Sequence, residues 1–191
     1  MEPKRCPWPG SDPAMVAYHD KEWGTPCHDD RLWFEFITLD AFQAGLSWQI
    51  VLNKREGFRK AFDDFQPEII VNYSAARQEG LRRNPEIIRN RLKIAATVSN
   101  AEAFLRVKEE FGSFDSYIWQ FTAGKPIQNT WKSQDEVPAS TPLSDRISQD
   151  LKKQGFKFVG TTIVYAFLQG AGIVNDHLVT CFRYKELCEK I

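Results

Sequence analysis

The chain has 191 residues, of which 42% are hydrophobic and 26% charged, with 25 basic residues balancing 25 acidic ones. This composition is typical of a globular protein, and the zero net charge argues against a general polyanion binder while still permitting a local basic patch. The sequence has neither the roughly 20-residue apolar run of a membrane helix nor the charged and apolar start of a signal peptide, so we expect a cytoplasmic protein without a membrane partner.

Helix signals begin near the N-terminus. An Asp-Pro pair at 12–13 predicts a helix that runs to about Trp23. Two aspartates at 29–30 predict a second helix, which ends near Gly45, and a third helix begins at Ser47.

The second half of the chain also has helical periodicity. Residues 85–112 predict one long helix or two short ones, and further helices are expected over 143–155, 161–171 and 176–188. Residues 125–141 predict a long connection, because prolines and a glycine flank them. Strand-like alternation is nearly absent, so the sequence predicts an all-α fold in one domain over 1–191.

A candidate metal site joins the two ends of the chain. His177 and Cys181 are four residues apart in the last predicted helix, a spacing that places both on one face. Cys6 and His19 lie near the other end and would complete a set of two thiolates and two imidazoles. Such a set is typical of structural zinc, with no open position for water.

Spacing alone leaves alternatives for this metal site. The neighbours Cys27 and His28 are a rival ligand pair, and Cys188 is a further thiol. A His/Cys pair four residues apart also occurs without any metal.

The segment between two predicted helices at 155–161 is a candidate phosphate-binding hairpin. Gly155 and Gly160 permit tight turning and close approach by another backbone. The N–H groups that begin the next helix, at Thr161, would be free to bind an anion, and Lys157 adds positive charge. A simple capped helix corner explains the same pattern.

Other residues near the hairpin and in the middle of the chain have less specific signals. Phe156 and Phe158 are expected to anchor the turn in the core. A second basic cluster, which is usually a solvated face, contains Arg82, Arg83, Arg89, Arg91 and Lys93.

Four long motifs resemble those of the DNA-3-methyladenine glycosylase I family. They are AYHDKEWG at 17–24, FQAGLSW at 42–48, GFKFVGTT at 155–162 and GIVNDH at 172–177. The resemblance covers roughly residues 5 to 185 in the same order, and so many long motifs rarely agree by chance.

The resemblance implies the helix-hairpin-helix glycosylase fold, with two fused lobes and a cleft between them. It implies hydrolysis of the N-glycosidic bond of 3-methyladenine in alkylated double-stranded DNA, the first step of base excision repair, by an enzyme that we expect to be a monomer. The family's zinc ligands fall on Cys6, His19, His177 and Cys181, which leaves Cys27 and Cys188 as ordinary cysteines.

The resemblance also implies a pocket for a base that has been extruded from the duplex. A methylated adenine is cationic, and aromatic faces attract cations. The family's base-holding residues match Tyr18 and Trp48, and Trp8 and Trp23 are expected as further walls. Core packing is the alternative role for each of these rings.

The family's buried carboxylate, usually Glu, falls on Asp40. Its side chain is one methylene shorter, so contact with the base requires a shifted backbone or a bridging water. We expect Asp40 to recognise the amino edge of the base and to stabilise the cationic sugar as the bond breaks. An exposed acid at the end of a helix is the alternative, and Asp176, expected to cap the last helix, is a rival catalytic group.

Leu46, at a turn between two predicted helices, is a candidate wedge for the gap that the base leaves, although a core leucine is equally compatible with its sequence. No lysine follows the hairpin as a nucleophile for lyase chemistry, so we expect a monofunctional enzyme. Two other functions remain: a zinc-stabilised DNA-binding module without catalysis, and a relative with a changed substrate, for which Asp40 is the motivating residue.

Overall fold

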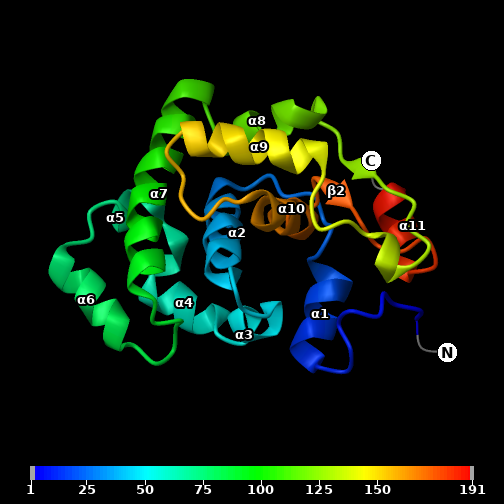
Figure 1. Cartoon of the computed structure of the whole chain (residues 1–191), viewed down its shortest axis with the longest axis horizontal. Coiled ribbons are helices and arrows are strands. Elements are labelled where there is room, and N and C mark those ends of the chain that lie inside the picture. The colour runs from blue at the N-terminus through cyan, green and yellow to red at the C-terminus, as the bar shows by residue number, and fades with distance from the viewer. Residues whose placement is uncertain (1–2, 190–191) are drawn as a thin grey trace.

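Helix α2, spanning Asp30–Gln43, lies at the centre of the fold in a computed structural model that describes residues 3–189 (Figure 1). Asp29 begins this helix because its side chain accepts a hydrogen bond from the backbone N–H of Leu32 at 2.9 Å. Every residue from Trp33 to Phe42 is buried, so α2 is enclosed on all sides and carries Asp40 into the interior.

The other elements surround α2. The helices are α1 (Pro13–Lys21), α3 (Trp48–Leu52), α4 (Arg55–Ala61), α5 (Pro67–Ile70), α6 (Ala75–Arg83), α7 (Arg91–Phe111), α8 (Phe114–Trp119), α9 (Pro142–Lys153), α10 (Thr161–Gly170) and α11 (Phe182–Cys188). Short 3-10 turns are η1 (Asp63–Phe65), η2 (Gln120–Thr122) and η3 (Gln134–Glu136). A two-residue parallel pair joins β1 (Ile127–Gln128) to β2 (Val174–Asn175), with Ile127 opposite Val174.

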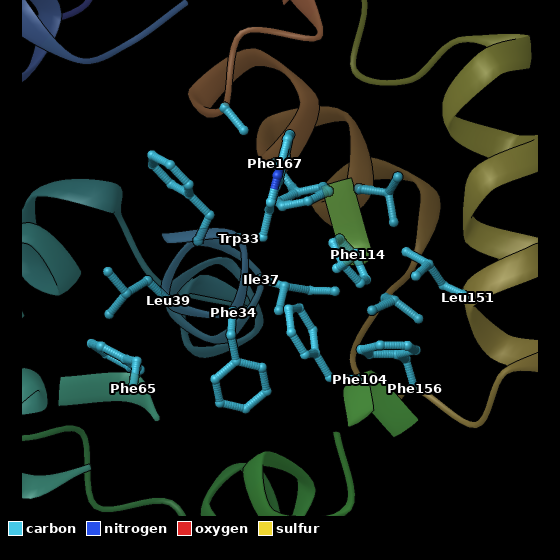
Figure 2. Packing of buried hydrophobic residues seen from close by; sticks show 14 of the residues in the cluster. Trp33, Phe34, Ile37, Leu39, Phe65, Phe104, Phe114, Leu151, Phe156 and Phe167 are labelled. Atoms are coloured by element: carbon cyan, nitrogen blue, oxygen red, sulfur yellow. The ribbon is translucent and has the colours of Figure 1, made fainter. Parts of the chain in front are cut away.

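The hydrophobic core combines residues from both halves of the chain. Helix α10 packs between α9 and α2, and α7 packs against α5 and α8. Figure 2 shows Phe34 and Trp33 of α2 among Phe104, Phe114 and Phe167 from later helices. The rings of Trp33 and Phe167 meet edge to face, with centroids 5.6 Å apart, a favourable aromatic geometry.

A smaller cluster lies where the two ends of the chain meet. Cys6, Leu178 and Cys181 are buried together, with Trp8 and Trp23 packed against them. The N-terminal segment and α11 lie on the same side of the molecule (Figure 1). Within residues 3–189, no helix combines the length and the apolar character needed to cross a membrane.

The predicted all-α class is confirmed in its main feature, but several helix boundaries are wrong. The third predicted helix is two helices, α3 and α4, separated at residues 53–54. The helix predicted over 85–112 begins only at Arg91, because the Asn90 side chain accepts from the N–H groups of Leu92 and Lys93. Helix α6 was not predicted, since among its residues only Leu81 is buried.

The last predicted helix is also shorter than expected. It begins at Phe182, and residues 176–181 form a turn instead. His177 and Cys181 therefore do not share a helix face, and Asp176 does not cap the helix. Tertiary contacts override the local pattern here, because β2 pairs with β1 and the Asp176 side chain bonds to residues distant in sequence.

Candidate active site and metal centre

A cavity of about 180 Å³ lies beside α2. All five residues that the sequence predicted for a base pocket line it: Trp8, Tyr18, Trp23, Asp40 and Trp48. The other lining residues, which the sequence did not single out, are Gln43, Gln134, Val137, Ala166 and Gln169. These come from the long connection and α10 as well as α2, and no local signal relates them to the cavity.

Four of the ten lining residues are aromatic. The ring of Trp8 meets Trp23 edge to face at 5.0 Å between centroids and Tyr18 at 6.3 Å. Tyr18 in turn lies 5.2 Å from Trp48 with the rings tilted by 45°. The ring faces of this group are electron-rich and suit a planar cation.

Among the residues that the structure describes, Asp40 is the one carboxyl group that lines the cavity. It is 4% exposed, and none of residues 3–189 donates a hydrogen bond to it. Burial raises the pKa of Asp40 well above its usual value. The pKa of Tyr18 is raised as well, mainly by its own burial and secondly by the nearby Asp40 carboxylate. The alternative of an exposed helix-end acid is therefore wrong, and an unpaired buried carboxyl is a typical feature of a functional site.

A buried ion-pair network supports the cavity wall from behind. The Arg55 guanidinium donates to Glu35 at 2.5 Å and to Glu22 at 2.6 Å. Glu35 is fully buried and also accepts from Arg59 at 2.8 Å. The network links α4 to α2 and to the residue preceding Trp23, so it holds these elements at a set distance. The sequence did not indicate this pairing.

Four buried ligand atoms meet at the second cluster. One atom each from Cys6, His19, His177 and Cys181 lies within 4.8 Å of all the others. Cys181 Sγ is 3.5 Å from His19 Nε2 and 3.5 Å from His177 Nδ1, and Cys6 Sγ is 3.7 Å from His177 Nδ1. A tetrahedral zinc with bonds of about 2.3 Å to sulfur and 2.0 Å to nitrogen separates such atoms by about 3.5 Å. The donor set therefore fits a metal ion.

In both histidines, the ring nitrogen that lies outside the cluster also has a hydrogen-bond partner. His19 Nδ1 lies 2.8 Å from Asp20, which is itself paired with Arg5, and His177 Nε2 lies 3.0 Å from the carbonyl oxygen of Trp23. Each contact orients the imidazole so that its other nitrogen faces the cluster, as outer partners do in metal sites. Cys27, a rival in the sequence, lies outside this cluster.

The connection between α9 and α10 brings the predicted hairpin residues to the surface. Lys157 is exposed, and its backbone N–H donates to Asn100 Oδ1 at 2.8 Å while its carbonyl accepts from the same side chain. Gly155 has a φ of +96°, and a Cβ there would meet Arg106 Nη2 at 2.9 Å. Backbone N–H groups of residues 158–162 donate to no group within the described part of the chain.

Two expectations about neighbouring residues require correction. Phe156 is buried as predicted, but Phe158 is only half-buried and Val159 takes its place in the core. In the second basic cluster, Lys93 is buried, and its ammonium group donates to the carbonyl oxygen of Ala44 at 2.6 Å. Its role is thus to hold the end of α2.

Leu46 follows that end of α2. It is 39% exposed, so the alternative of a core leucine is wrong. Gly45 precedes it with a φ of +79°, a conformation that glycine adopts without strain. The Lys93 contact and this turn together present Leu46 between α2 and α3.

Asp176, the rival catalytic group, is not among the described residues that line the cavity. It is 2% exposed and accepts four hydrogen bonds, from Asn129 (2.6 Å), Trp131 (2.8 Å), Tyr165 (2.5 Å) and Gln169 (2.8 Å). These partners join the long connection to α10.

Known proteins resemble this chain over nearly its whole length. A sequence model of the methyladenine glycosylase family matches residues 8–184. DNA-3-methyladenine glycosylase 1 of Escherichia coli (strain K12) is 44% identical over 181 residues, a match that covers 95% of this chain and 97% of the relative. DNA-3-methyladenine glycosylase of Haemophilus influenzae (strain ATCC 51907 / DSM 11121 / KW20 / Rd) is 44% identical over 177 residues, covering 93% and 96%.

Solved structures agree in the fold. A crystal structure of 3-methyladenine DNA glycosylase I superposes with a TM-score of 0.91 at 48% identity, covering 94% of this chain and 98% of the other. A single-residue variant of 3-methyladenine DNA glycosylase I in complex with 3-methyladenine gives a TM-score of 0.91 at 33% identity, covering 93% and 96%.

Proposed function

This chain belongs to the methyladenine glycosylase family and acts as a DNA-3-methyladenine glycosylase, and we propose that the cavity beside Asp40 is where the extruded base binds. The observation that carries the proposal is a buried carboxyl group without a hydrogen-bond partner among residues 3–189, set in a wall of aromatic rings. An unpaired acid is costly to bury, so its retention there points to a ligand that pairs with it.

The chemistry follows from the charge of the substrate. 3-Methyladenine in DNA is cationic, and the faces of Tyr18 and Trp48 together with the Asp40 carboxylate attract it. The bond between the sugar carbon and the base nitrogen breaks, and its electron pair leaves with the base, which becomes neutral. Asp40 stabilises the positive charge that develops on the sugar, and a water molecule adds to that carbon and loses a proton. The shorter side chain of Asp40 reaches the base directly or through one water.

No lysine lines the cavity in the described part of the chain, which supports a monofunctional hydrolase. One hydrophobic core joins the two halves of the chain. We propose that a single domain acts as a cytoplasmic monomer, with the cavity in the cleft between two fused lobes.

The α9–α10 connection is the proposed contact with the duplex backbone, as a helix-hairpin-helix element. Its unpartnered N–H groups at Gly160 and Thr161 suit a phosphate, and the exposed Lys157 adds positive charge. Gly155 allows the tight turn. Leu46, exposed in the turn between α2 and α3, is the proposed wedge that fills the gap left by the base.

Cys6, His19, His177 and Cys181 would hold one zinc ion. A complete set of four protein ligands leaves no position for a substrate or a reactive water, so the metal would supply stability and no chemistry. It would tie the N-terminal segment that carries Trp8 to the segment before α11.

Release of free base tests the function. The purified protein is incubated with methylated duplex DNA, the released bases are separated by chromatography, and metal content is measured on the same sample. Release of 3-methyladenine is the expected result. Binding of DNA without release of any base would identify a non-catalytic module, and preferential release of 7-methylguanine, or of hypoxanthine from a matched duplex, would identify a changed substrate.

A further inference from the structure

The side-chain amide of Gln169 is held in one orientation. Its Nε2 lies 2.8 Å from Asp176 Oδ2. A carboxylate accepts hydrogen bonds and does not donate them, so the amide must turn its NH2 group toward Asp176. The amide carbonyl Oε1 is therefore directed away from Asp176, and it accepts no hydrogen bond from any residue that the structure describes.

Asp176 itself cannot turn to release that amide. Asn129 and Trp131 bond to one of its oxygens, and Tyr165 shares the other with Gln169. Asp176 is 2% exposed, so no water competes with these four donors. The orientation of Gln169 is consequently built into the core before any base enters.

Gln169 lines the cavity together with Asp40. Helix α2 brings the Asp40 carboxyl group to it, and α10 brings the Gln169 amide, which donates one N–H to Asp176 and directs its carbonyl oxygen away from Asp176. The ionised Asp40 carboxylate and the Gln169 carbonyl oxygen both accept hydrogen bonds, so the edge of an occupant that meets these oxygens must offer hydrogens. The exocyclic amine at position 6 of an adenine carries two N–H donors, whereas an oxo purine presents an oxygen there.

We propose that Gln169, oriented by Asp176, accepts a hydrogen bond from the exocyclic amine of the base and rejects purines that carry an oxo group at that position. Asp176 is in this scheme a positioning residue, because it touches only Gln169 and the residues around it. The inference rests on the proposed function, and it names the group that distinguishes adenine from guanine and hypoxanthine derivatives.

The expected discrimination has a simple origin. An oxo group opposite Oε1 would leave two acceptors facing each other without a hydrogen. An unsatisfied buried acceptor of this kind lowers affinity roughly 5- to 150-fold. Sites built to hydrogen-bond a substrate group discriminate strongly against analogues that lack it.

Two free bases provide the test: 3-methyladenine, with an amino group at position 6, and 3-methylhypoxanthine, with an oxo group there and the ring N–H proton that accompanies it. Their dissociation constants are measured by calorimetry for the wild type and for Gln169→Leu, which keeps similar bulk and removes the acceptor. The expected result is that the preference for the amino base falls about ten-fold in the variant. The control Gln78→Leu changes an amide on α6 that donates to the Tyr73 carbonyl, and it should keep the wild-type preference.

Asp176→Asn tests the positioning step, because an amide at 176 allows Gln169 to turn over. As a single substitution, Asp176→Asn should lower the preference for 3-methyladenine over 3-methylhypoxanthine. In the Gln169→Leu background it should cause no further decrease in that preference. Thermal melting establishes that each variant is folded. An unchanged ratio in Gln169→Leu would overturn the role of Gln169, and additive losses in the double variant would overturn the role of Asp176.

The outcome is separable from that of the proposed function. Base release from methylated DNA by the wild type, together with an unaltered ratio in Gln169→Leu, would reject this inference and leave the glycosylase activity intact. Absence of base release by the wild type would reject the proposed function. The dissociation constants of the two free bases would still test whether the Gln169 amide distinguishes an amino group from an oxo group.

Discussion

The hydroxyl group of Tyr18 lies directly against the backbone of Gly170: a Cβ atom at position 170 would be 2.9 Å from Tyr18 Oη. Real Cβ contacts are longer, so any larger residue there must displace the Tyr18 ring, which lines the cavity. We expect Gly170→Ala to lower kcat/KM for 3-methyladenine release roughly 10- to 100-fold, because displacements of about 1 Å in a site have costs of this size.

The control for this change is Gly80→Ala. Gly80 lies inside α6, and an added Cβ there meets no atom within 4 Å. Since alanine favours helix over glycine, the control should melt at the same temperature or higher and keep full activity. Full activity in Gly170→Ala would show that the position of Tyr18 does not matter for release.

Asp40→Asn should lower kcat/KM by about 100-fold or more, the usual size of a lost electrostatic contact with a developing charge. Burial raises the pKa of Asp40 well above its usual value, so wild-type kcat/KM should increase with pH as this acid ionises in the free enzyme. The variant should lack that limb of the pH profile. A variant as fast as the wild type would exclude Asp40 from the chemistry.

The same pKa shift predicts an effect on stability. A raised folded-state pKa means that the folded protein holds the Asp40 proton more tightly than the unfolded chain. The stability from this group is thus complete below the unfolded value, near 3.9, and is lost as the pH rises through the folded value. Urea unfolding at several pH values should show that the free energy of unfolding of Asp40→Asn rises relative to that of the wild type as the pH increases above about 4.

Leu46→Ala tests the wedge. Leu46 is 39% exposed, so its truncation should change the free energy of unfolding by no more than about 0.5 kcal/mol. Release of base from duplex DNA should fall about ten-fold, because the extruded state loses the side chain that fills its gap. Free 3-methyladenine should bind as before. Ile69→Ala, which truncates a side chain of 43% exposure on α5, is the matched control and should retain wild-type release.

Cys181→Ser tests the metal centre. Removing one of four ligands should abolish stoichiometric zinc, measured by atomic emission, and lower the melting temperature by several degrees because the two ends of the chain are no longer joined. Cys188→Ser changes a thiol outside the cluster and should keep one zinc per chain. Equal metal content in the two variants would exclude the proposed ligand set.

Lys157→Ala tests the hairpin. Loss of one phosphate contact should weaken DNA binding a few-fold and reduce the slope of log affinity against log salt by about one. Free-base binding should not change, since Lys157 is not among the residues that line the cavity. Lys185, an exposed lysine on α11, provides the control Lys185→Ala, which should leave the salt slope unaltered.

Local chemistry made part of this structure predictable. Asp12 and Asp29 cap α1 and α2 as expected, because a cap involves only the next few residues. The four metal ligands and the five pocket residues were named from family motifs, and the structure brings each group together. The turn at His177 was predicted as helix, since its hydrogen bonds and its strand partner lie far away in sequence.

By itself, then, the sequence determined the helical class, the starts of α1, α2 and α10, and the residue types of the pocket and metal cluster, because short-range hydrogen bonds and side-chain chemistry specify these features. Only the tertiary structure decided that Asp40 is buried without a hydrogen-bond partner among residues 3–189, that Arg55 joins Glu22 to Glu35, and that Asp176 orients Gln169. Each of these depends on side chains that packing brings together from separate helices, and a pairing of that kind leaves no pattern within any one segment.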